Sequence, residues 1–347
     1  MRKVWDWQLF LLILSIGSVS LLVIFSLNRP LFQNQLFFWI LGLFLLWFFS
    51  YFDYRIWQKV SIIFYVFVIL LLLFLLFVGD PIRGSVRWFD IGPFRLQPSE
   101  MAKASTILLL ATFFKNRDGA KIFYLLISLL IVLPIFILVL IQPDIGNSLP
   151  LLAIWLAISL ASGFKIKDFT ILLLLGALLS AILFEILAPY QKERILTFID
   201  PARDPLGTGY HIIQAKLAVG SGQFLGRGLG NSTQSQLKFL PEAESDFIFA
   251  ATSEQLGFLG GTLLISLYSL LLLKILVLSR ENDEYSRLIL IGVFAFMATQ
   301  FLVNVGMNVG ILPVTGITLP LVSYGGSSLI TTLFLLGIIF ATKRFSI

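Results

Sequence analysis

The sequence has 347 residues, of which 58% are apolar and only 13% are charged, and its mean hydropathy is +0.95. A soluble globular domain has a nearly even balance of apolar and polar residues, so this composition excludes that class and predicts a protein that crosses a membrane several times. The net charge of +6 gives no reason to expect a nucleic-acid partner, because in a membrane protein the placement of Lys and Arg reports topology.

A transmembrane helix needs roughly 20 mainly apolar residues, because the hydrocarbon core is about 30 Å thick. Continuous aliphatic runs such as 70–76 and 171–175 lack the alternation of a membrane β-barrel, so the expected fold class is an all-α polytopic membrane protein. The first segment is expected to be retained, because no small-residue cleavage site follows it. About ten helices are predicted, near residues 5–27, 35–51, 59–78, 98–114, 122–141, 147–163, 168–189, 247–274, 288–308 and 325–342.

Basic residues mark one side of the membrane in alternate connections between these segments. The positive-inside rule assigns that side to the cytoplasm and predicts that both termini lie there, with residues 1–347 forming a single integral membrane domain. The opposite side then holds the connections 28–34 and 79–97 and one large loop, residues 190–246. The basic series consists of Arg2/Lys3, Arg55/Lys59, Lys115/Arg117/Lys121, Lys165/Lys167, Lys274/Arg280/Arg287 and Lys343/Arg344.

The large loop is the first place to look for chemistry. It carries acidic and basic residues in balance and is rich in glycine, in G-T-G-Y-H (207–211) and in G-S-G-Q-F-L-G-R-G-L-G (220–230). A structureless loop of this length is uncommon in a compact domain unless it has a function.

Glu100 and Lys103 stand three residues apart near the start of the fourth segment, so they share one helix face. An ionisable side chain inside a membrane costs about 2.5–3.5 kcal/mol on insertion scales, so each one needs a partner, a water-filled cavity or a function. One interpretation is an internal ion pair in a helix that begins at Pro98 and Ser99. The other is a polar wall that faces a substrate cavity.

Three further groups of polar or helix-breaking residues lie near the outer side. Asp144 in Q-P-D is a common turn residue and also a candidate site residue. Gln300, Asn304 and Asn308 recur every four residues and predict a polar stripe, for which interhelical hydrogen bonding is the default explanation. The stretch 313–328, P-V-T-G-I-T-L-P-L-V-S-Y-G-G-S-S, breaks helical structure where only protein or a water-filled cavity can cover it.

Three carboxylates gather in the stretch Lys238–Ala250, K-F-L-P-E-A-E-S-D-F-I-F-A, immediately before the eighth segment. They are Glu242, Glu244 and Asp246. Ser245 and Asp246 stand where an N-cap would accept backbone N–H groups, so the acids simply start a helix in one interpretation. In the other interpretation Asp246 is a site residue, and the two roles are compatible.

Few residues are available for a metal site built from soft ligands. The sequence has no cysteine, which excludes disulfides, a thiolate nucleophile and cysteine-bound metal. His211 is the one histidine, and in a glycine-rich loop a structural role is favoured for it.

Taken together, these stretches resemble the SEDS family of polytopic membrane glycosyltransferases, which polymerise peptidoglycan from lipid II. Within the family they are more similar to the elongation branch than to the division branch. The motifs that carry the resemblance are R-W-F-D-I-G-P-F-R-L-Q-P-S-E-M-A-K, Q-P-D-I-G, D-P-L-G-T-G-Y-H-I-I-Q-A-K-L-A-V-G-S-G, L-P-E-A-E-S-D-F-I-F-A and N-V-G-M-N-V-G-I-L-P-V-T-G-I-T-L-P-L-V-S-Y-G-G-S-S-L.

The resemblance implies ten helices in the bacterial cytoplasmic membrane, a large outer loop between the seventh and eighth, and an active site that faces outward. It implies that Asp246 is essential for polymerisation. Ser245, Glu244 and Asn147 depart from the usual residues of the family, which leaves substrate detail open. The residues expected to bind substrate or to line a cavity are Glu100, Lys103, Asp144, Arg194, Arg203, Ser323 and Tyr324, and the supporting residues are Glu242, Ser245, Gln300, Asn304 and Asn308.

Two roles for Asp246 follow from the reaction that the family catalyses. A sugar hydroxyl is a weak nucleophile, so Asp246 is expected to act as a general base, or to hold a divalent cation (Mg²⁺ or Mn²⁺) against the diphosphate. Backbone at the glycines of the loop is expected to approach sugar and phosphate closely. The diphosphate is expected to be neutralised by that cation or by Lys103, Arg194, Arg203 or Arg227.

The family implies several partners: lipid II, polyprenyl diphosphate, membrane lipid, a class B penicillin-binding protein and other proteins of the elongation complex. Two other functions remain open at this stage. Polar groups in broken helices also suit a flippase that moves lipid II across the bilayer. A non-catalytic scaffold for cell-wall enzymes is the third possibility.

Overall fold

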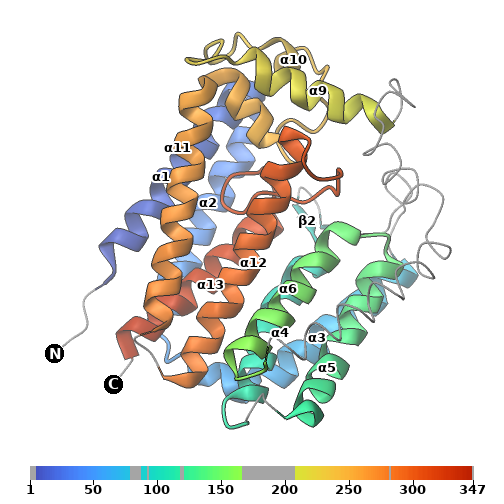
Figure 1. Cartoon of the computed structure of the whole chain (residues 1–347), viewed down its shortest axis with the longest axis vertical. Coiled ribbons are helices and arrows are strands. Elements are labelled where there is room, and N and C mark those ends of the chain that lie inside the picture. Colours follow the sequence, from blue (N-terminus) through green and yellow to red (C-terminus); the bar gives the residue numbers. More distant parts are fainter. Residues whose placement is uncertain are drawn as a thin grey trace.

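The computed structural model describes residues 5–78, 87–91, 94–117, 121–165, 208–280 and 283–345. Almost all of this part of the chain is helical, and Figure 1 shows long helices packed side by side with two shorter ones across one end. The helices are α1 (Trp7–Leu27), α2 (Arg29–Ser50), α3 (Ile56–Val78), α4 (Pro98–Phe114), α5 (Ile122–Ile141), α6 (Ile145–Ala161), α9 (Thr208–Ser221), α10 (Thr233–Gln236), α11 (Ile248–Ser279), α12 (Glu284–Val309) and α13 (Gly326–Phe345), and an antiparallel hairpin joins β1 (Phe89–Ile91) to β2 (Phe94–Leu96).

The predicted all-α polytopic fold is confirmed. Within the described residues, seven helices are long and apolar enough to cross a membrane, and α4 and α6 are shorter, with 17 residues each. Nine of the ten predicted segments therefore correspond to described helices. The predicted segment 168–189 and the first part of the large loop lie outside the described residues.

The bounds of the helices follow local capping signals. α4 begins at Pro98, as the sequence predicts, because proline suits the first turn of a helix. α2 begins at Arg29, six residues before the predicted start. Asn28 caps α2, since its side chain accepts a hydrogen bond from the Leu31 backbone N–H at 3.3 Å, and Pro30 lies in the first turn.

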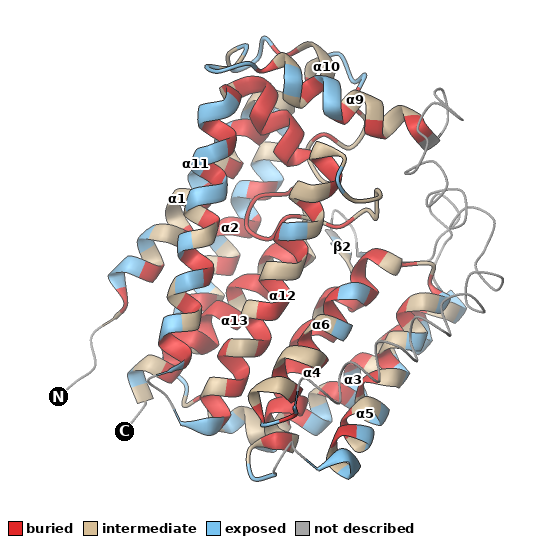
Figure 2. Cartoon of the chain, viewed as in Figure 1, coloured by how far each residue is buried: buried red, intermediate tan, exposed pale blue. Residues whose placement is uncertain are grey.

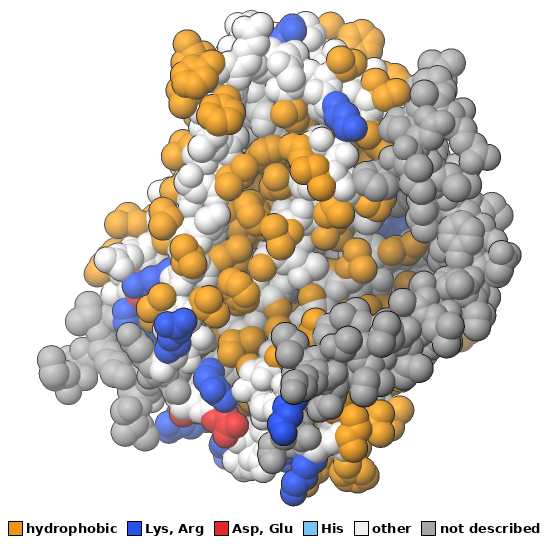
Figure 3. Space-filling view, viewed as in Figure 1, with side chains coloured by type: hydrophobic (Ala, Val, Ile, Leu, Met, Phe, Trp, Pro, Cys, Tyr) orange, Lys and Arg blue, Asp and Glu red, His pale blue; other side chains and the backbone are white. Residues whose placement is uncertain are grey.

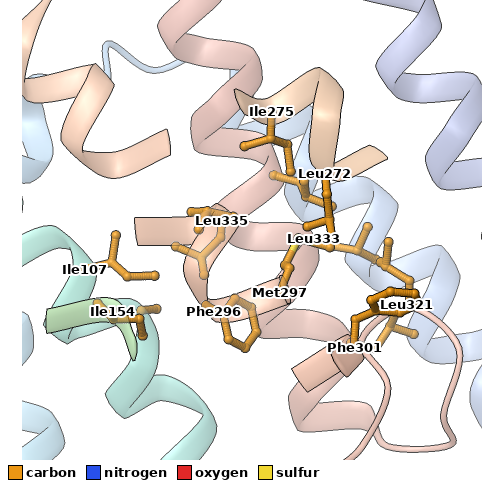
Figure 4. Packing of buried hydrophobic residues seen from close by; sticks show 14 of the residues in the cluster. Ile107, Ile154, Leu272, Ile275, Phe296, Met297, Phe301, Leu321, Leu333 and Leu335 are labelled. Carbon is orange, nitrogen blue, oxygen red and sulfur yellow. The ribbon is translucent and has the colours of Figure 1, made fainter. Parts of the chain in front are cut away.

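α4, α12 and α13 are the most deeply buried of the described helices (Figure 2). In Figure 4, Phe296 and Met297 of α12 lie among side chains of α4, α6, α11 and α13. Lipid tails are as apolar as these side chains, so close packing rather than apolar burial must hold the helices together. Gly292 allows such packing, because a Cβ there would lie only 2.9 Å from side-chain atoms of Ile107 on α4 and Ile158 on α6.

The start of α1 and the end of α13 lie at the same end of the bundle, and α9 and α10 lie at the opposite end (Figure 1). On the face shown in Figure 3, Lys and Arg side chains gather toward the end that holds the termini. This arrangement agrees with termini that share one side of the membrane. The assignment of that side to the cytoplasm remains a prediction.

α11 is interrupted at Gly257, where φ is 69° and ψ is −164°, values that a helix does not contain. The orange ribbon of α11 bends at its upper end in Figure 1. Backbone groups of the loop 222–228 pair with this interruption. Phe258 N–H donates to the Gln223 carbonyl at 2.8 Å, and Arg227 N–H donates to the Glu254 carbonyl at 2.9 Å.

Two glycines of the loop make this backbone contact possible. A Cβ at Gly222 would lie 1.9 Å from the Ser253 carbonyl oxygen, and one at Gly226 would lie 2.1 Å from the Gln255 carbonyl oxygen. These glycines therefore allow the loop backbone to lie against α11, and the approach of the loop glycines to sugar and phosphate stays a prediction. The carboxylate of Glu254, fully buried on α11, then accepts hydrogen bonds from the backbone at Gln234 (2.8 Å) and Ser235 (3.0 Å) and holds α10.

Candidate functional site

The backbone of Asp246 is held by two side chains of α12. Asn304 Nδ2 and Asn308 Nδ2 donate hydrogen bonds to the Asp246 carbonyl at 2.9 and 3.0 Å. Asn308 Oδ1 in turn accepts a hydrogen bond from the Ala250 N–H at 2.9 Å, in the first turn of α11. Both carboxamides are fully buried, so their hydrogen bonds form away from water and fix where the acidic stretch enters α11.

The backbone carbonyls of Glu244 and Ser245, which precede Asp246, are held by the segment between α12 and α13. Ser323 Oγ donates to the Ser245 carbonyl at 2.6 Å, and the Tyr324 N–H donates to the Glu244 carbonyl at 2.7 Å. Gln35 of α2 supports this segment, because its Nε2 donates to the Ser323 carbonyl at 3.1 Å. Three consecutive carbonyls, at residues 244–246, are thus fixed by groups far away in the sequence.

The carboxylate of Asp246 lies beside Gly316. A Cβ built on Gly316 would lie 3.4 Å from Asp246 Oδ2, and Gly316 has a φ of 72°, a left-handed conformation that favours glycine. The neighbouring Ile317 carbonyl accepts a hydrogen bond from Asn304 Nδ2 at 2.7 Å. The same carboxamide therefore orders both Asp246 and the backbone beside its carboxylate.

The capping interpretation of the acidic stretch is wrong. Phe247 occupies the N-cap position of α11 and provides no side-chain cap, so neither Ser245 nor Asp246 stands at that position. Ser245 Oγ instead bonds to Glu242 Oε2 at 3.0 Å, and the Glu242 carbonyl accepts the Phe247 N–H at 3.1 Å. The stretch is a tight turn that places Asp246 one residue outside the cap.

The polar stripe of α12 is confirmed, with different roles for its members. Asn304 and Asn308 bond to the acidic stretch, as described above. Gln300, one turn further into the bundle, is fully buried, and neither side-chain amide atom has a hydrogen-bond partner among the described residues. The stripe therefore positions Asp246 with two of its three carboxamides.

A second polar cluster surrounds Lys103, and the predicted ion pair is present in it. Lys103 Nζ lies 2.7 Å from Glu100 Oε1 and donates to Asn147 Oδ1 at 3.0 Å. Its third side is covered by the Phe296 ring, whose centroid is 5.0 Å away. Because Lys103 is 0% exposed, its ammonium group is fully committed to partners inside the bundle.

Asp144 belongs to the same cluster and also starts α6, and its role as a substrate-binding residue stays a prediction. Its side chain caps the helix by accepting the Asn147 N–H at 3.3 Å. Asp144 Oδ2 also accepts hydrogen bonds from Asn147 Nδ2 at 2.8 Å and Gln97 Nε2 at 3.1 Å. Arg87 Nη1 lies 3.6 Å from Asp144 Oδ1. Two cations and two carboxylates therefore balance one another in this buried cluster.

The segment 315–317 lies between the two clusters. A Cβ on Gly146, two residues after Asp144, would lie 2.7 Å from the Thr315 carbonyl oxygen. Gly316 lies against Asp246 on its other side, as shown above. The second cluster therefore supports the backbone that packs against the carboxylate.

Other predicted site residues fall elsewhere. Arg194 and Arg203 lie outside the described residues. Arg227 is exposed and bonds within the loop, to the Ser221 carbonyl at 3.2 Å and to Thr233 Oγ1 at 3.1 Å. Among the described residues, no group of three or more His, Cys, Asp or Glu side chains could hold a metal ion. The ring of His211 stacks on Phe247 at 6.2 Å, which fits its predicted structural role.

Sequence reasoning missed three residues that the clusters use. Arg87 pairs with Asp144, Gln35 holds the 323–325 backbone, and Glu254 holds α10. The signal for Gln35 and Glu254 was a polar side chain within an apolar helix, which requires a partner. Arg87 gave no such signal, because it precedes a predicted helix in an outer connection.

Comparisons with known proteins agree with this architecture. The cell cycle protein family of FtsW, RodA and SpoVE matches residues 4–346. The peptidoglycan glycosyltransferase MrdB of Escherichia coli (strain K12) is 40% identical over 261 residues, which are 74% of this chain and 70% of MrdB.

Two solved structures share the fold along nearly the whole chain. A chain of a peptidoglycan synthase complex, solved to show how polymerization and crosslinking are coordinated, has a TM-score of 0.87 at 32% identity and covers 98% of each chain. The rod shape determining protein RodA of Thermus thermophilus has a TM-score of 0.75 at 29% identity, covering 98% of this chain and 97% of its own. The chain belongs to the FtsW/RodA/SpoVE family, the SEDS family that its motifs resemble.

Proposed function

We propose that this protein is a peptidoglycan glycosyltransferase that polymerises lipid II on the outer face of the bacterial cytoplasmic membrane during cell elongation. The similarity to MrdB supports the reaction class. The similarity to a rod shape determining protein supports the elongation role, as do the motifs around Asn304–Leu329. The family also contains division and sporulation proteins, so the elongation role is the finer part of the proposal.

One observation carries the proposal. Hydrogen bonds hold the three consecutive backbone carbonyls that end at Asp246, and the Asp246 carboxylate lies beside Gly316. Fixing the backbone holds a catalytic group in reactive geometry before substrate arrives, which contributes much of an enzyme's rate. A glycine beside the carboxylate removes the side chain that would otherwise occupy that space.

Asp246 acts as the general base in a single inverting displacement. The 4-hydroxyl oxygen of one GlcNAc attacks the anomeric carbon of the MurNAc of another chain and forms the new glycosidic bond. The bond from that carbon to the diphosphate oxygen breaks, and polyprenyl diphosphate leaves with the electron pair. Asp246 accepts the hydroxyl proton, a step that contributes about 10²–10⁴ in rate. The diphosphate is a good leaving group, so no second carboxyl group is needed.

The charge on the diphosphate requires a cation, and Lys103 is unsuited to that task. It is buried and engaged by Glu100 and Asn147, so its role is to hold α4 against α6. Mg²⁺ is commonly held by one or two carboxylates together with substrate phosphates. In the alternative mechanism Asp246 would hold Mg²⁺ or Mn²⁺ instead of accepting the proton, and such an ion would neutralise the leaving group.

A class B penicillin-binding protein is the proposed partner. The solved complex that this chain resembles coordinates polymerization with crosslinking, and crosslinking requires a transpeptidase. Polyprenyl diphosphate, membrane lipid and other proteins of the elongation complex complete the proposed set of partners.

The function is tested by adding lipid II to the outside of liposomes that contain the purified chain and its penicillin-binding partner. Polymerisation yields long glycan strands, which a gel separates from monomer. Movement of labelled lipid II to the inner leaflet without strands would support a flippase instead. Neither product, with the partner still bound, would support a scaffold. The metal role is tested in the same assay by stripping divalent ions, since unchanged polymerisation after verified removal would exclude it.

A further inference from the structure

Four large apolar side chains are exposed where the outer loop meets the interruption of α11. Phe224 and Leu225 of the loop are 61% and 74% exposed, and Phe258 and Leu259 of α11 are 63% and 48% exposed. The rings of Phe224 and Phe258 stack with centroids 6.0 Å apart. These four residues form one surface, which is called the outer apolar patch below. Soluble surfaces seldom expose so many large apolar side chains side by side.

Backbone pairing holds the outer apolar patch in place. The Phe258 N–H donates to the Gln223 carbonyl at 2.8 Å, and the Leu259 N–H donates to the Phe224 carbonyl at 3.2 Å. On the other side of the interruption, the Gly228 N–H donates to the Gln255 carbonyl at 3.0 Å. Phe224 and Leu225 are therefore directed outward by hydrogen bonds on both sides of Gly257, instead of packing under the loop.

The depth of the patch follows from the length of α11. Residues 258–279 extend about 33 Å at a rise of about 1.5 Å per residue, close to the roughly 30 Å of hydrocarbon in a bilayer. The interruption at Gly257 therefore lies where the membrane ends on the outer side. Further along α11, Leu263, Leu270 and Leu273 are exposed as well. The patch is thus continuous with the helix face that borders lipid, and Figure 3 shows apolar side chains grouped at the upper end of the molecule beside it.

We propose that the outer apolar patch inserts into the outer leaflet and anchors the loop 222–229 at the membrane surface. Its occupant is the acyl region of bilayer lipid, because the patch continues a lipid-facing helix and lies at the depth where hydrocarbon ends. Aromatic and leucine side chains at this depth are typical of interfacial anchors.

The anchor has a consequence for the acidic stretch. Glu254 and Gln255 accept the loop's backbone N–H groups, and they belong to the part of α11 that leads back to Asp246. Anchoring the loop therefore fixes the height of Asp246 relative to the membrane surface. This consequence rests on the proposed function, in which the diphosphate of a lipid-linked sugar lies at that height.

The absence of cysteine makes a direct test possible. Single cysteines are introduced into the full chain as Leu225→Cys in the patch, Asn231→Cys at an exposed polar position of the same loop, and Leu263→Cys in the lipid-facing part of α11. Each is spin-labelled and reconstituted in liposomes. Collision rates are then measured with molecular oxygen, which concentrates in lipid, and with a nickel chelate, which stays in water.

The label at 225 should collide mainly with oxygen, as the label at 263 does, while the label at 231 should collide mainly with the nickel chelate. A label at 225 that behaves like the one at 231 would overturn the proposal. Weak collisions with both reagents, with or without a penicillin-binding partner, would show that protein covers the patch and would also overturn it. The collision rates report whether lipid, water or protein surrounds each label, and they do not depend on turnover. The test of the patch is therefore independent of the test of the proposed reaction.

Discussion

Asp246 is useful as a base only if its carboxylate stays where a sugar hydroxyl can meet it. The main chain at this residue is fixed, since two buried carboxamides of α12 hold the Asp246 carbonyl. A helix cap would have held the side chain itself and used up one of its oxygens. In the turn at Glu242–Phe247, Phe247 rather than Asp246 occupies the cap position.

Replacing Asn304 should therefore reduce catalysis more than binding. Asn304→Leu removes the hydrogen bonds to the Asp246 and Ile317 carbonyls, and small misplacements of a reacting group can lower kcat roughly 10- to 100-fold. The control is Gln300→Leu, one turn away on the same helix, whose amide has no partner among the described residues. Steady-state polymerisation should show a lower kcat with an unchanged KM for Asn304→Leu and near-native values for Gln300→Leu. Equal losses in both variants would refute a specific role for Asn304.

Lys103 illustrates the cost of an unpaired buried charge. Lys103→Met leaves the Glu100 carboxylate buried without its cation, which should destabilise the protein by about 3–5 kcal/mol. The double variant Glu100→Gln/Lys103→Met removes both charges and should recover much of that loss. Thermal unfolding in detergent compares the two. A double variant less stable than Lys103→Met alone would contradict the ion-pair explanation.

At the scale of elements, the apolar pattern predicted most helices to within a few residues, because membrane helices are long and uniform. The apolar pattern failed where polar residues form part of a helix. The start of α2 holds Arg29, Gln33 and Asn34, and apolarity alone placed the boundary after them. It also missed α9 and α10, since their helical structure depends on contact with α11 and on the Glu254 carboxylate rather than on a strong pattern of their own.

The loop and α11 should tolerate a methyl group at one glycine and not at another. Gly226→Ala places a Cβ about 2.1 Å from the Gln255 carbonyl oxygen, at a φ of 84° that strains any larger residue. Gly220→Ala is the control, because a Cβ there meets nothing within 4 Å and α9 favours alanine. Limited proteolysis should cut the loop faster in Gly226→Ala only. Equal protection in both variants would argue against the pairing.

At the scale of the whole molecule, one carboxylate ties the ends of the chain together. Asp6 precedes α1, and its Oδ2 lies 2.5 Å from Lys343 Nζ of α13 and 3.3 Å from Lys274 Nζ of α11. Burial alone would raise the pKa of Asp6, but the hydrogen bonds with Lys343 and with the Leu9 N–H lower it below 3.8. A lowered pKa stabilises the folded state above that value, and the stabilisation is lost as pH falls through the folded-state pKa.

Asp6→Asn should therefore lower the unfolding temperature at neutral pH, and its deficit relative to the native chain should shrink as pH falls below 3.8 toward about 2. Asp90→Asn is the control, because its pair with Arg95 is largely exposed and such pairs contribute little. A deficit for Asp6→Asn that stays constant down to the lowest pH would exclude the ion-pair contribution.

The candidate site shows why sequence alone reached only part of the answer. The polar stripe on α12 and the acidic stretch could each be recognised from their own residues. Their contact could not, because Asn304 and Asn308 lie 58 and 62 residues from Asp246 and no local pattern links a carboxamide to a distant carbonyl. The capping hypothesis for Asp246 had the same weakness, since a helix start is read locally to within a few residues.

The central claim is that the Asp246 carboxylate, held by its main chain, performs the proton transfer. The most direct measurement is the rate of lipid II polymerisation by Asp246→Asn in complex with its penicillin-binding partner, beside Glu244→Gln, a neighbour whose backbone carbonyl rather than side chain is held. Asp246→Asn should fold, bind the partner and lose at least about 100-fold in rate, while Glu244→Gln stays near the native rate. Polymerisation by Asp246→Asn at the native rate would contradict the account.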